Sequence, residues 1–478
     1  MKFGGSSVRD AERMREVANI ICSFPDQCPA VVLSAMGKST NLLLECAELA
    51  LKTSPNLIPE MMCLREVKTL HRDTVVELDI DTATREEVEE LLKNLEKLLV
   101  GISMMNELTL RGRDTLVSFG ERLSTRIFAG YLRRCGVNAR QLDAFDIGFI
   151  STDDFTNGQL LPATYAKLRE SLTREEGEEP YLPIITGFLA RGVESNAITT
   201  LGRGGSDLSA TVIGKALNLS EVQVWKDVDG VLTADPRLIE NPCVVNELTY
   251  DEATELSYFG AQVLHPQAMR PAIEQGGSLN VRVKNSYNIS APGTVIQLER
   301  DMTESLLTSI VKKSNVVMLD IVSSRMLGQY GFLAKVFNIC AEAGVSVDVV
   351  ATSEVSVSLT LDTGKIWSRD LEESELEALR SSFEELADVS LQRNKDIISL
   401  ICNVGRSSEI LEIVFRVLNQ MGVNVEMISQ GSSKTNIALI VDHKHGEAVV
   451  KALHKEFFEE RNALKMPRPS GRRDLDSL

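Results

Sequence analysis

Residues 198–237 read ITTLGRGGSDLSATVIGKALNLSEVQVWKDVDGVLTADPR and place a glycine-rich turn between a short apolar run and a helical pattern. Glycines at positions 202, 204 and 205 allow positive φ angles and a close approach of the backbone to a ligand. Ser206 is a favourable N-cap for the helix that follows. The start of such a helix offers free N–H groups and the positive end of a dipole, so the segment predicts an anion site. A lone glycine cluster is more often a plain capped turn, and the interpretation therefore depends on the neighbouring segments.

The charges on and after this turn suit a small polar ligand. Arg203 and Asp207 stand on the turn with opposite charges, which matches the two ends of an amino acid. After the helix, residues 222–225 form an apolar strand that leads into a loop containing Lys226 and two aspartates, Asp227 and Asp229. The segment is thus predicted to be strand, turn, helix, strand and acidic loop.

A second glycine turn stands at the N-terminus, where Lys2 leads into Gly4 and Gly5 and a helical pattern follows. Strands usually run about five to six residues, so this one is expected to begin in upstream sequence that has been trimmed, together with any targeting peptide. Residues 30–41 repeat the change from apolar strand to turn, with Ser34 and Thr40 on the turn. We expect both turns to lie near the first one.

Strand-like and helical patterns alternate along the first 300 residues. Residues 116–124 are predicted to open a further helix, and a glutamate there, Glu121, is usually a residue that the helix dipole favours. Its alternative role, contact with the amine of a substrate, requires the neighbouring loops to converge on it. Alternating strands and helices predict a mainly parallel sheet with helices on both faces, and ligands bind such sheets beyond the carboxyl ends of the strands.

Composition excludes several classes of protein. The 478 residues suffice for two or three domains, and 43% hydrophobic with 25% charged residues is typical of a globular protein. A net charge of −17 without a basic stripe argues against a nucleic-acid binder, and no apolar run approaches the ~18 residues of a membrane span. The eight cysteines form no CxxC pair and the five histidines no metal-ligand spacing, so we expect reduced thiols and no protein-held metal site.

The pattern changes after about residue 300, where a unit of strands and helices occurs twice. Gly344-Val-Ser-Val-Asp348 is repeated 78 residues later as Gly422-Val-Asn-Val-Glu426, and the helices that precede these strands match at the same offset. The spacing predicts two ferredoxin-like βαββαβ units. A duplicated packing unit without a ligand is the alternative at this point.

Five segments in order resemble the motifs of aspartokinases in the amino-acid kinase family: MKFGGSSV, VVLSAMGKSTNLL, SFGERLS, TLGRGGSDLSA and WKDVDGVLTADPR. The resemblance covers essentially the whole chain, and the duplicated unit resembles paired ACT domains, which bind amino acids. It implies an α/β amino-acid kinase fold, a mainly parallel sheet sandwiched by helices, followed by two ACT domains. It also implies transfer of the ATP γ-phosphate to the β-carboxylate of L-aspartate, the step that opens lysine, threonine and methionine biosynthesis, with ATP and Mg²⁺ as cofactors.

The resemblance assigns roles to residues of the kinase part. Lys2, Arg203 and Asp207 would be catalytic, with Lys2 between the two reacting anions and Arg203 on the substrate α-carboxylate. Substrate binding would involve Thr40, Glu121, Arg203, Ser206 and Asp207, of which Glu121 and Asp207 would hold the α-ammonium. The nucleotide would be bound by Lys2, Gly4, Gly5, Ser34, Trp225, Lys226, Asp227, Asp229 and Arg237, with Trp225 at the edge of the loop.

The first ACT domain is the expected effector site for lysine, with S-adenosylmethionine as a further candidate. The implied contacts are Met326, Gly331, Phe332, Leu333, Ser346, Asp348, Ser353 and Glu354. In the second copy Glu409 stands where Gly331 does, so the glycine turn is lost and the effector is assigned to the first copy. ACT domains commonly pair between subunits, so we expect at least a homodimer and neither nucleic acid nor membrane as partner.

One residue departs from the family pattern. Gln262, in the segment Phe259-Gly-Ala-Gln262-Val-Leu-His265-Pro, stands where many members have a lysine that would contact ATP phosphates. His265 in the same segment is interpreted as structural. Two rival functions remain: a related kinase with another carboxylate substrate, and a catalytically inactive ACT-type amino-acid sensor.

The expected division is a catalytic domain over 1–300, a first ACT domain over 301–388 and a second over 389–478. No glycine-rich dinucleotide motif follows, so we expect no fused homoserine dehydrogenase. The segment Thr352–Asp362 (TSEVSVSLTLD) and the GAQVLHPQ form resemble plant monofunctional enzymes. A plastid location with the transit peptide absent from this chain is therefore expected, with bacterial cytoplasm as the alternative.

Overall fold

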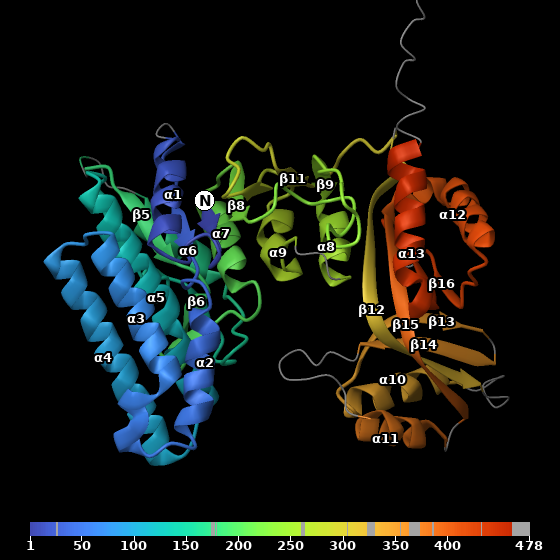
Figure 1. The fold of residues 1–478 in the computed structure, drawn as a ribbon, viewed down its shortest axis with the longest axis horizontal. Helices are drawn as coiled ribbons and strands as arrows, with labels where there is room; N and C mark the ends of the chain where they lie inside the picture. The colour runs from blue at the N-terminus through green and yellow to red at the C-terminus, as the bar shows by residue number, and fades with distance from the viewer. Residues whose placement is uncertain are drawn as a thin grey trace, which may run out of the picture. The chain divides into compact units, whose positions relative to one another are not determined.

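The chain forms two compact units in the computed structural model (Figure 1). The structure describes residues 1–460 except 25–26, 174–176, 178, 260–262, 304, 323–329, 354, 363–372, 385–386 and 432. The first unit comprises residues 1–231, 246–254 and 263–300, and the second comprises 232–245, 255–262 and 301–478. The chain therefore crosses between the units more than once, and each is described separately.

The first unit is built on an eight-stranded sheet in the order β3-β5-β2-β1-β8-β10-β11-β9. All neighbouring strands are parallel except the antiparallel pair β10 and β11. The strands are β1 (Lys2–Phe3), β2 (Val31–Leu33), β3 (Ala139–Leu142), β5 (Leu182–Thr186), β8 (Glu221–Lys226), β9 (Glu247–Thr249), β10 (Asn280–Asn285) and β11 (Thr294–Gln297). A small second sheet joins β4 (Ile150–Ser151), β6 (Leu189–Gly192) and β7 (Ile198–Thr200).

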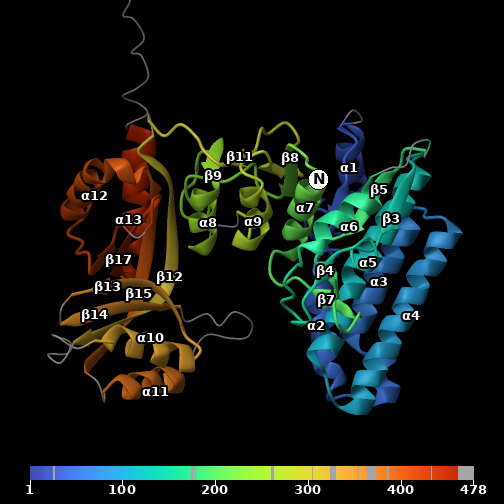
Figure 2. The same cartoon turned by 180° about the vertical axis from the view of Figure 1, so that it is seen from behind.

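Helices cover both faces of the large sheet, as the mainly parallel pattern requires. On one face, α1 (Ala11–Cys22), α2 (Ser39–Ala50), α3 (Met62–Glu77), α4 (Thr82–Met105) and α5 (Leu110–Arg134) share one hydrophobic core with Phe3, Val31 and Leu33 of the central strands. The alternate residue Val32 points to the other face, where it lines a cavity with residues of α7. That face carries α6 (Ala163–Leu172), α7 (Gly205–Ala216) and α9 (Pro266–Glu274), as Figure 2 shows from behind. The predicted α/β sandwich is confirmed.

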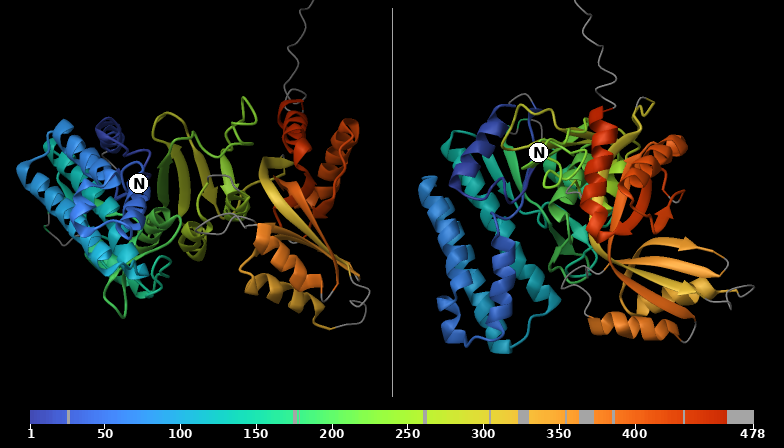
Figure 3. Two further views of the ribbon diagram at one scale, coloured as in Figure 1. Left: turned by 60° about the horizontal axis from the view of Figure 1, so that its bottom comes forward. Right: turned by 45° about the vertical axis from the view of Figure 1, so that its right-hand side comes forward.

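The second unit is a six-stranded antiparallel sheet in the order β13-β14-β12-β15-β17-β16. Its strands are β12 (Leu307–Val322), β13 (Ser346–Thr352), β14 (Ser356–Asp362), β15 (Asp388–Cys402), β16 (Met427–Ser429) and β17 (Asn436–Asp442). The helices α10 (Phe332–Glu342) and α11 (Glu373–Glu384) pack near one end, and α12 (Ser407–Met421) and α13 (His443–His454) near the other (Figure 3). Further helices of the described residues are α8 (Tyr250–Tyr258) and the short η2 (Pro55–Glu60), η3 (Val404–Arg406) and η4 (Lys455–Glu460).

The two halves of this sheet form two modules that share the long strands β12 and β15. We call first module the part around the core of α10 and α11, which includes Val317, Leu319 and Ile321 of β12. The second module is the part around the core of α12 and α13, which includes Leu307 and Ile310 from the beginning of β12. The second module thus takes one strand from residues that precede the first module in sequence. The expected boundary at 388/389 falls at the first residue of β15.

Two features of the described residues, the state of the cysteines and the character of the helices, bear on the sequence predictions. Its eight cysteines are free thiols, four of them buried, and the sulfur atoms of Cys46 and Cys63 lie 2.7 Å apart between α2 and α3. Among the described residues, no helix combines the length and apolar character needed to cross a membrane.

Candidate active site

Three glycine-containing turns meet at the carboxyl ends of the central strands. β1 lies between β2 and β8, with Phe3 beside Leu33 and Trp225, so the turns that follow β1 and β2 emerge together. The N–H of Gly37 donates to the carbonyl of Gly5 at 3.1 Å. A Cβ on Gly5 would lie 2.9 Å from the carbonyl oxygen of Ala35, so only glycine fits this contact. The predicted convergence of the turns is therefore present.

The central turn begins α7 differently from the prediction. The N-cap is Gly204, with a left-handed φ of 72°, and Ser206 lies inside the first turn rather than at the cap. Ser206 is closely packed instead, because a Cβ on Gly187 would lie 2.6 Å from its own Cβ. A Cβ on Gly204 would collide with the Cβ of His265, so the turn and the start of α9 are packed directly against each other. The prediction of Ser206 as N-cap was wrong because the glycine supplies the turn geometry without a side-chain cap.

Lys2 and Asp207 form the charged centre of this region. The Lys2 Nζ lies 2.7 Å from Asp207 Oδ1, and both side chains are at most 10% exposed. Burial of Asp207 opposes its ionisation, but the ammonium groups of Lys2 and Lys226 outweigh burial and lower the pKa of this carboxyl. Asp207 is therefore a carboxylate at neutral pH, located on the first turn of α7.

Glu121 is a buried carboxyl with an unsatisfied oxygen. The backbone N–H of Ala35 donates to its Oε1 at 3.3 Å, whereas the buried Oε2 has no hydrogen-bond partner. Burial raises the pKa of Glu121 to about 8, with the Ala35 hydrogen bond and the Lys2 charge acting in the opposite direction. Glu121 lies in the middle of α5 rather than near a helix start, so the prediction that residues 116–124 open a helix was wrong. The helix begins earlier, at Leu110, and its apolar periodicity continues through residues 116–124.

Lys226 and the loop after β8 lie beside this centre. The Lys226 ammonium donates to the carbonyl of Val263, and burial lowers the pKa of Lys226 against the opposing charge of Asp207. Asp229 accepts hydrogen bonds from Asn285 at 2.8 Å and Asn288 at 3.0 Å, at the carboxyl end of β10. Asp227 is exposed. The loop is therefore anchored at Asp229 and leaves Asp227 accessible.

The other predicted residues of the kinase part are distributed unevenly. Ser34 is partly buried on the second turn, Thr40 is partly buried in the first turn of α2, and Arg203 is exposed on the central turn. Trp225 is fully buried and stacks on Phe3, with ring centroids 5.7 Å apart, so its ring lies in the hydrophobic core rather than at the edge of the loop. Arg237 belongs to the second unit, where it pairs with Asp235, and Gln262 lies outside the described residues.

Three residues were not assigned to the site from the sequence. His265 is half-buried, its buried Nδ1 has no hydrogen-bond partner, and burial, with the nearby charge of Arg203, lowers its pKa despite the Asp207 carboxylate. Asn285 and Asn288, which hold Asp229, are the others. Their signal in the sequence is a cluster of polar residues at and directly after the end of the alternating strand at 280–285, which is the usual position of ligand loops in such sheets.

The predicted effector residues surround the start of α10 and the edge strand β13. Gly331 is the N-cap of α10 with φ 81°, and a Cβ there would meet no atom within 4 Å. The Asp348 side chain is fully buried and accepts from Lys313 at 2.6 Å and from the Tyr258 hydroxyl at 2.8 Å. Leu333, Ser346 and Ser353 are exposed and Phe332 is buried. Met326 and Glu354 lie outside the described residues.

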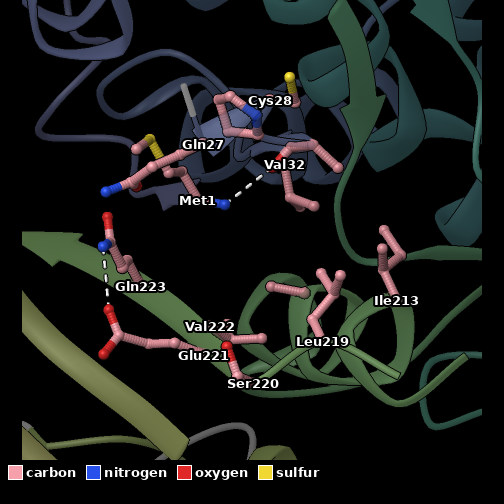
Figure 4. Close-up of a pocket in the computed structure, with 13 residues that line it drawn as sticks. Met1, Gln27, Cys28, Val32, Ile213, Leu219, Ser220, Glu221, Val222 and Gln223 are labelled. Atoms are coloured by element: carbon pink, nitrogen blue, oxygen red, sulfur yellow. Dashed lines mark hydrogen bonds between the residues drawn. The ribbon is translucent and has the colours of Figure 1, made fainter. Parts of the chain in front are cut away.

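The described residues contain no group of three or more His, Cys, Asp or Glu side chains that could hold a metal ion. A cavity of about 450 Å³ is lined by the residues drawn in Figure 4. These residues place it at the opposite ends of the strands from the glycine turns. It is lined by residues that precede β1 and β2 or begin β8, such as Met1, Cys28 and Glu221, and by Ile213 of α7. It is therefore separate from the site at the carboxyl ends.

Comparison with known proteins shows the family of this chain. The model of the amino acid kinase family matches residues 1–285, and an ACT domain model matches residues 319–366 and 401–457. The chain is 60% identical over 459 residues to aspartokinase 1, chloroplastic, of Arabidopsis thaliana, which covers 96% of this chain and 80% of that protein.

Two crystal structures of Escherichia coli aspartokinase III are also similar. The complex with aspartate and ADP, in the R-state, has a TM-score of 0.78 and 33% identity. The complex with lysine and aspartate, in the T-state, has a TM-score of 0.76 and 32% identity. Each match covers 96% of this chain and 99% of the other. The chain belongs to the aspartokinases of the amino acid kinase family.

Proposed function

We propose that this chain transfers the ATP γ-phosphate to the β-carboxylate of L-aspartate at the site formed by Lys2, Glu121 and Asp207. The observation that carries the proposal is the buried Lys2–Asp207 pair beside the unpaired oxygen of Glu121. A lysine flanked by carboxylates at the carboxyl ends of parallel strands suits a substrate with both an ammonium group and anionic groups.

Lys2 acts on the two reacting anions. Phosphoryl transfer to a carboxylate brings two negatively charged groups together, and the protein contributes mainly by positioning them and neutralising charge. The Lys2 ammonium is held by Asp207. On binding, it lies between the β-carboxylate and the γ-phosphate. No general base is needed, because a carboxylate is already ionised at neutral pH.

Three groups recognise the amino-acid part of the substrate. Glu121 and Asp207 accept hydrogen bonds from the α-ammonium, and the exposed Arg203 binds the α-carboxylate. Thr40 and Ser206, in the first turns of α2 and α7, complete the pocket. The unsatisfied Oε2 of Glu121 supports this role, because a buried carboxyl oxygen without a partner is costly until a donor arrives.

The nucleotide occupies the neighbouring turns. N–H groups of Gly4 and Gly5 and the hydroxyl of Ser34 donate to phosphate oxygens, and the loop at Lys226, Asp227 and Asp229 holds the remainder. Mg²⁺ usually keeps several waters and binds through one or two carboxylates and substrate phosphates, so the accessible Asp227 fits an ion that arrives with ATP. The ion would supply charge neutralisation on the phosphates. Trp225 supports this loop from the core.

The regulatory and cellular parts of the proposal follow the family. Residues 1–300 form the catalytic domain, and the first module binds lysine around Gly331 and Asp348, with S-adenosylmethionine as a further effector. The chain forms at least a homodimer through its ACT domains and acts in a plastid, as the name of the Arabidopsis relative suggests. The product feeds lysine, threonine and methionine biosynthesis.

The test is ATP- and Mg²⁺-dependent formation of aspartyl hydroxamate, with L-glutamate as control substrate and L-lysine titrated into the assay. We expect turnover with aspartate only, and suppression by lysine. Lys2→Ala should lower kcat/KM by about 10³-fold, since a cation that stabilises transferring phosphate contributes at least that much. Lys52→Ala removes an exposed lysine of the same domain and should leave activity unchanged. Turnover of Lys2→Ala at the wild-type rate would contradict the proposal.

A further inference from the structure

Thr233 fastens the segment that follows the nucleotide loop to the second module. Its carbonyl accepts from the N–H of Ile310 on β12 at 2.8 Å, and the carbonyl of the preceding Leu232 accepts from the Ser309 hydroxyl at 2.9 Å. Thr233 and Cys243 also exchange backbone and side-chain hydrogen bonds, which close the intervening loop. All of these residues belong to the second unit.

The hydroxyl of Thr233 makes a further contact with the end of α13. Thr233 Oγ1 lies 3.0 Å from Nε2 of His454, and the two residues are separated by 221 positions in sequence. Thr233 is 5% exposed and His454 is 1% exposed. Burial lowers the pKa of His454, although Glu459 acts in the opposite direction. The imidazole is therefore neutral at pH 7 and forms a buried hydrogen bond between uncharged groups.

The hydrogen-bond directions are fixed by the neighbouring groups. Thr233 Oγ1 already accepts from the N–H of Cys243 at 3.0 Å, and His454 Nδ1 lies 3.4 Å from the Glu459 carboxylate. A tautomer with the proton on Nδ1 donates to Glu459 and lets Nε2 accept the Thr233 hydroxyl. The resulting order of carboxylate, imidazole and hydroxyl is that of a nucleophilic triad, but the burial of both Thr233 and His454 leaves no access for a substrate.

The position of Thr233 in the chain gives this contact a role in nucleotide binding. Only two residues separate it from Gly230, the end of the loop that carries Lys226, Asp227 and Asp229. Upstream, the Lys226 carbonyl accepts from the N–H of Ser286 at 2.8 Å and Asp229 is held by Asn285 and Asn288, so the loop is fixed at its beginning and near its end. A shift at Thr233 therefore changes the path available to residues 226–230.

We propose that the hydrogen bond between Thr233 and His454 positions the nucleotide loop, so that the packing of α13 in the second module sets the affinity for ATP. The inference rests on the proposed nucleotide-binding role of residues 226–230. Thr233 and His454 are positioning residues and touch neither substrate. Because coupling between binding sites is reciprocal, any ligand whose binding alters the packing of α13 changes ATP affinity, and ATP changes the affinity for that ligand equally.

The test compares ATP kinetics of Thr233→Val and His454→Phe with those of the wild type. A single hydrogen bond contributes ~0.5–1.5 kcal/mol, so we expect each variant to raise KM for ATP by about three- to tenfold, with kcat and KM for aspartate within about twofold. The double variant should be no worse than the more affected single variant, because both remove the same bond. Thr233→Ser keeps the hydroxyl and should restore wild-type KM for ATP.

Thr360→Val is the matched control, since it removes a buried hydrogen bond to the N–H of Val349 in the first module. It should leave KM for ATP unchanged. An unaltered KM for ATP in both Thr233→Val and His454→Phe would overturn the inference, as would an equal rise in Thr360→Val.

Amide hydrogen exchange separates this inference from the proposed function. If the wild type shows no ATP-dependent turnover of aspartate, the proposed function fails, and exchange of residues 226–231 then decides the inference. Faster exchange there in Thr233→Val and His454→Phe, and not in Thr360→Val, supports positioning of the loop. Unchanged exchange in both variants overturns it.

Discussion

The two proposed amino-acid sites of this chain share a plan and differ in completeness. Each combines a helix that begins at a left-handed glycine with a buried acidic side chain: Gly204 with Glu121 in the catalytic site, and Gly331 with Asp348 in the effector site. Gly204 is packed against His265, whereas a Cβ on Gly331 would meet no atom within 4 Å. Glu121 has an unsatisfied oxygen, whereas Asp348 is already bound to Lys313 and Tyr258.

These differences show how similar parts serve a substrate and an effector. The catalytic site is rigidly packed, and its unsatisfied carboxyl favours binding of an ammonium group from the substrate. In the proposed effector site there is free space around Gly331, and the Asp348 carboxylate is paired with Lys313. An effector ammonium must therefore compete with Lys313 for Asp348. On the proposed assignment, lysine binding has to break the contact between Lys313 on β12 and Asp348 on β13, which is the kind of change that regulation requires.

The largest expected effect comes from Gly204→Ala. The new Cβ collides with His265, and the left-handed φ adds ~1–2 kcal/mol of strain, so the turn and the start of α9 must both shift. We expect kcat/KM for aspartate to fall on the order of 100-fold, because small displacements at a catalytic site are costly. Steady-state kinetics and a thermal melt measure the two components.

Gly276→Ala is the matched control for this substitution. Gly276 has a φ of 69° in the same unit, and a Cβ there would meet no atom within 4 Å, so the variant adds strain without a collision. It should lower the melting temperature slightly and keep activity. Equal loss of activity in both variants would show that strain rather than packing makes Gly204 necessary.

Gly331→Ala should affect regulation and leave catalysis intact. Strain at φ 81° shifts the N–H groups at the start of α10 that are proposed to bind the effector carboxylate. We expect the lysine concentration for half-inhibition to rise by about tenfold, which corresponds to ~1.4 kcal/mol, with kcat and KM unchanged in the absence of lysine. Inhibition curves at fixed aspartate and ATP concentrations measure this shift.

Gly422→Ala places the same strain in the second module. Gly422 has a φ of 66° at the end of α12, and a Cβ there would again meet no atom within 4 Å. Inhibition by lysine should be unchanged. The opposite result, weaker inhibition in Gly422→Ala and none in Gly331→Ala, would move the effector to the second module.

The sequence predicted the parts of this comparison that depend on local pattern. Glycine turns, strand ends and the repeat at an offset of 78 residues identified the α/β fold, the two modules and the segments that meet in the catalytic site. In the second module α12 begins at the N-cap Arg406 with a φ of −111°, so no left-handed residue starts this helix, as the loss of glycine implied, and Glu409 pairs with Arg406.

Features that depend on long-range packing could not be predicted. An apolar strand end does not tell which face each residue takes, so Trp225 was placed at the loop although it stacks on Phe3 in the core. A search for repeats finds the matching helices. It does not reveal that the second module includes the beginning of β12, whose residues precede the first module in sequence. The contact between Thr233 and His454 spans 221 positions and has no sequence signal.

The smallest expected effect is a pH dependence, which sharpens the contrast between Glu121 and Asp348. Because burial raises the pKa of Glu121 to about 8 in the free chain, most of it is protonated at pH 7 and must ionise to bind the substrate ammonium fully. KM for aspartate should therefore fall by about fivefold between pH 7 and pH 8.5, which is below the roughly eightfold gain in ionised Glu121, since Asp207 shares the ammonium. Asp207 has a lowered pKa and contributes no change in this range.

Glu121→Gln should raise KM for aspartate and abolish its pH dependence while KM for ATP keeps the wild-type profile. A wild-type pH dependence of KM for aspartate in Glu121→Gln would mean that another group titrates. The unpaired carboxyl would then no longer distinguish the catalytic site from the effector site.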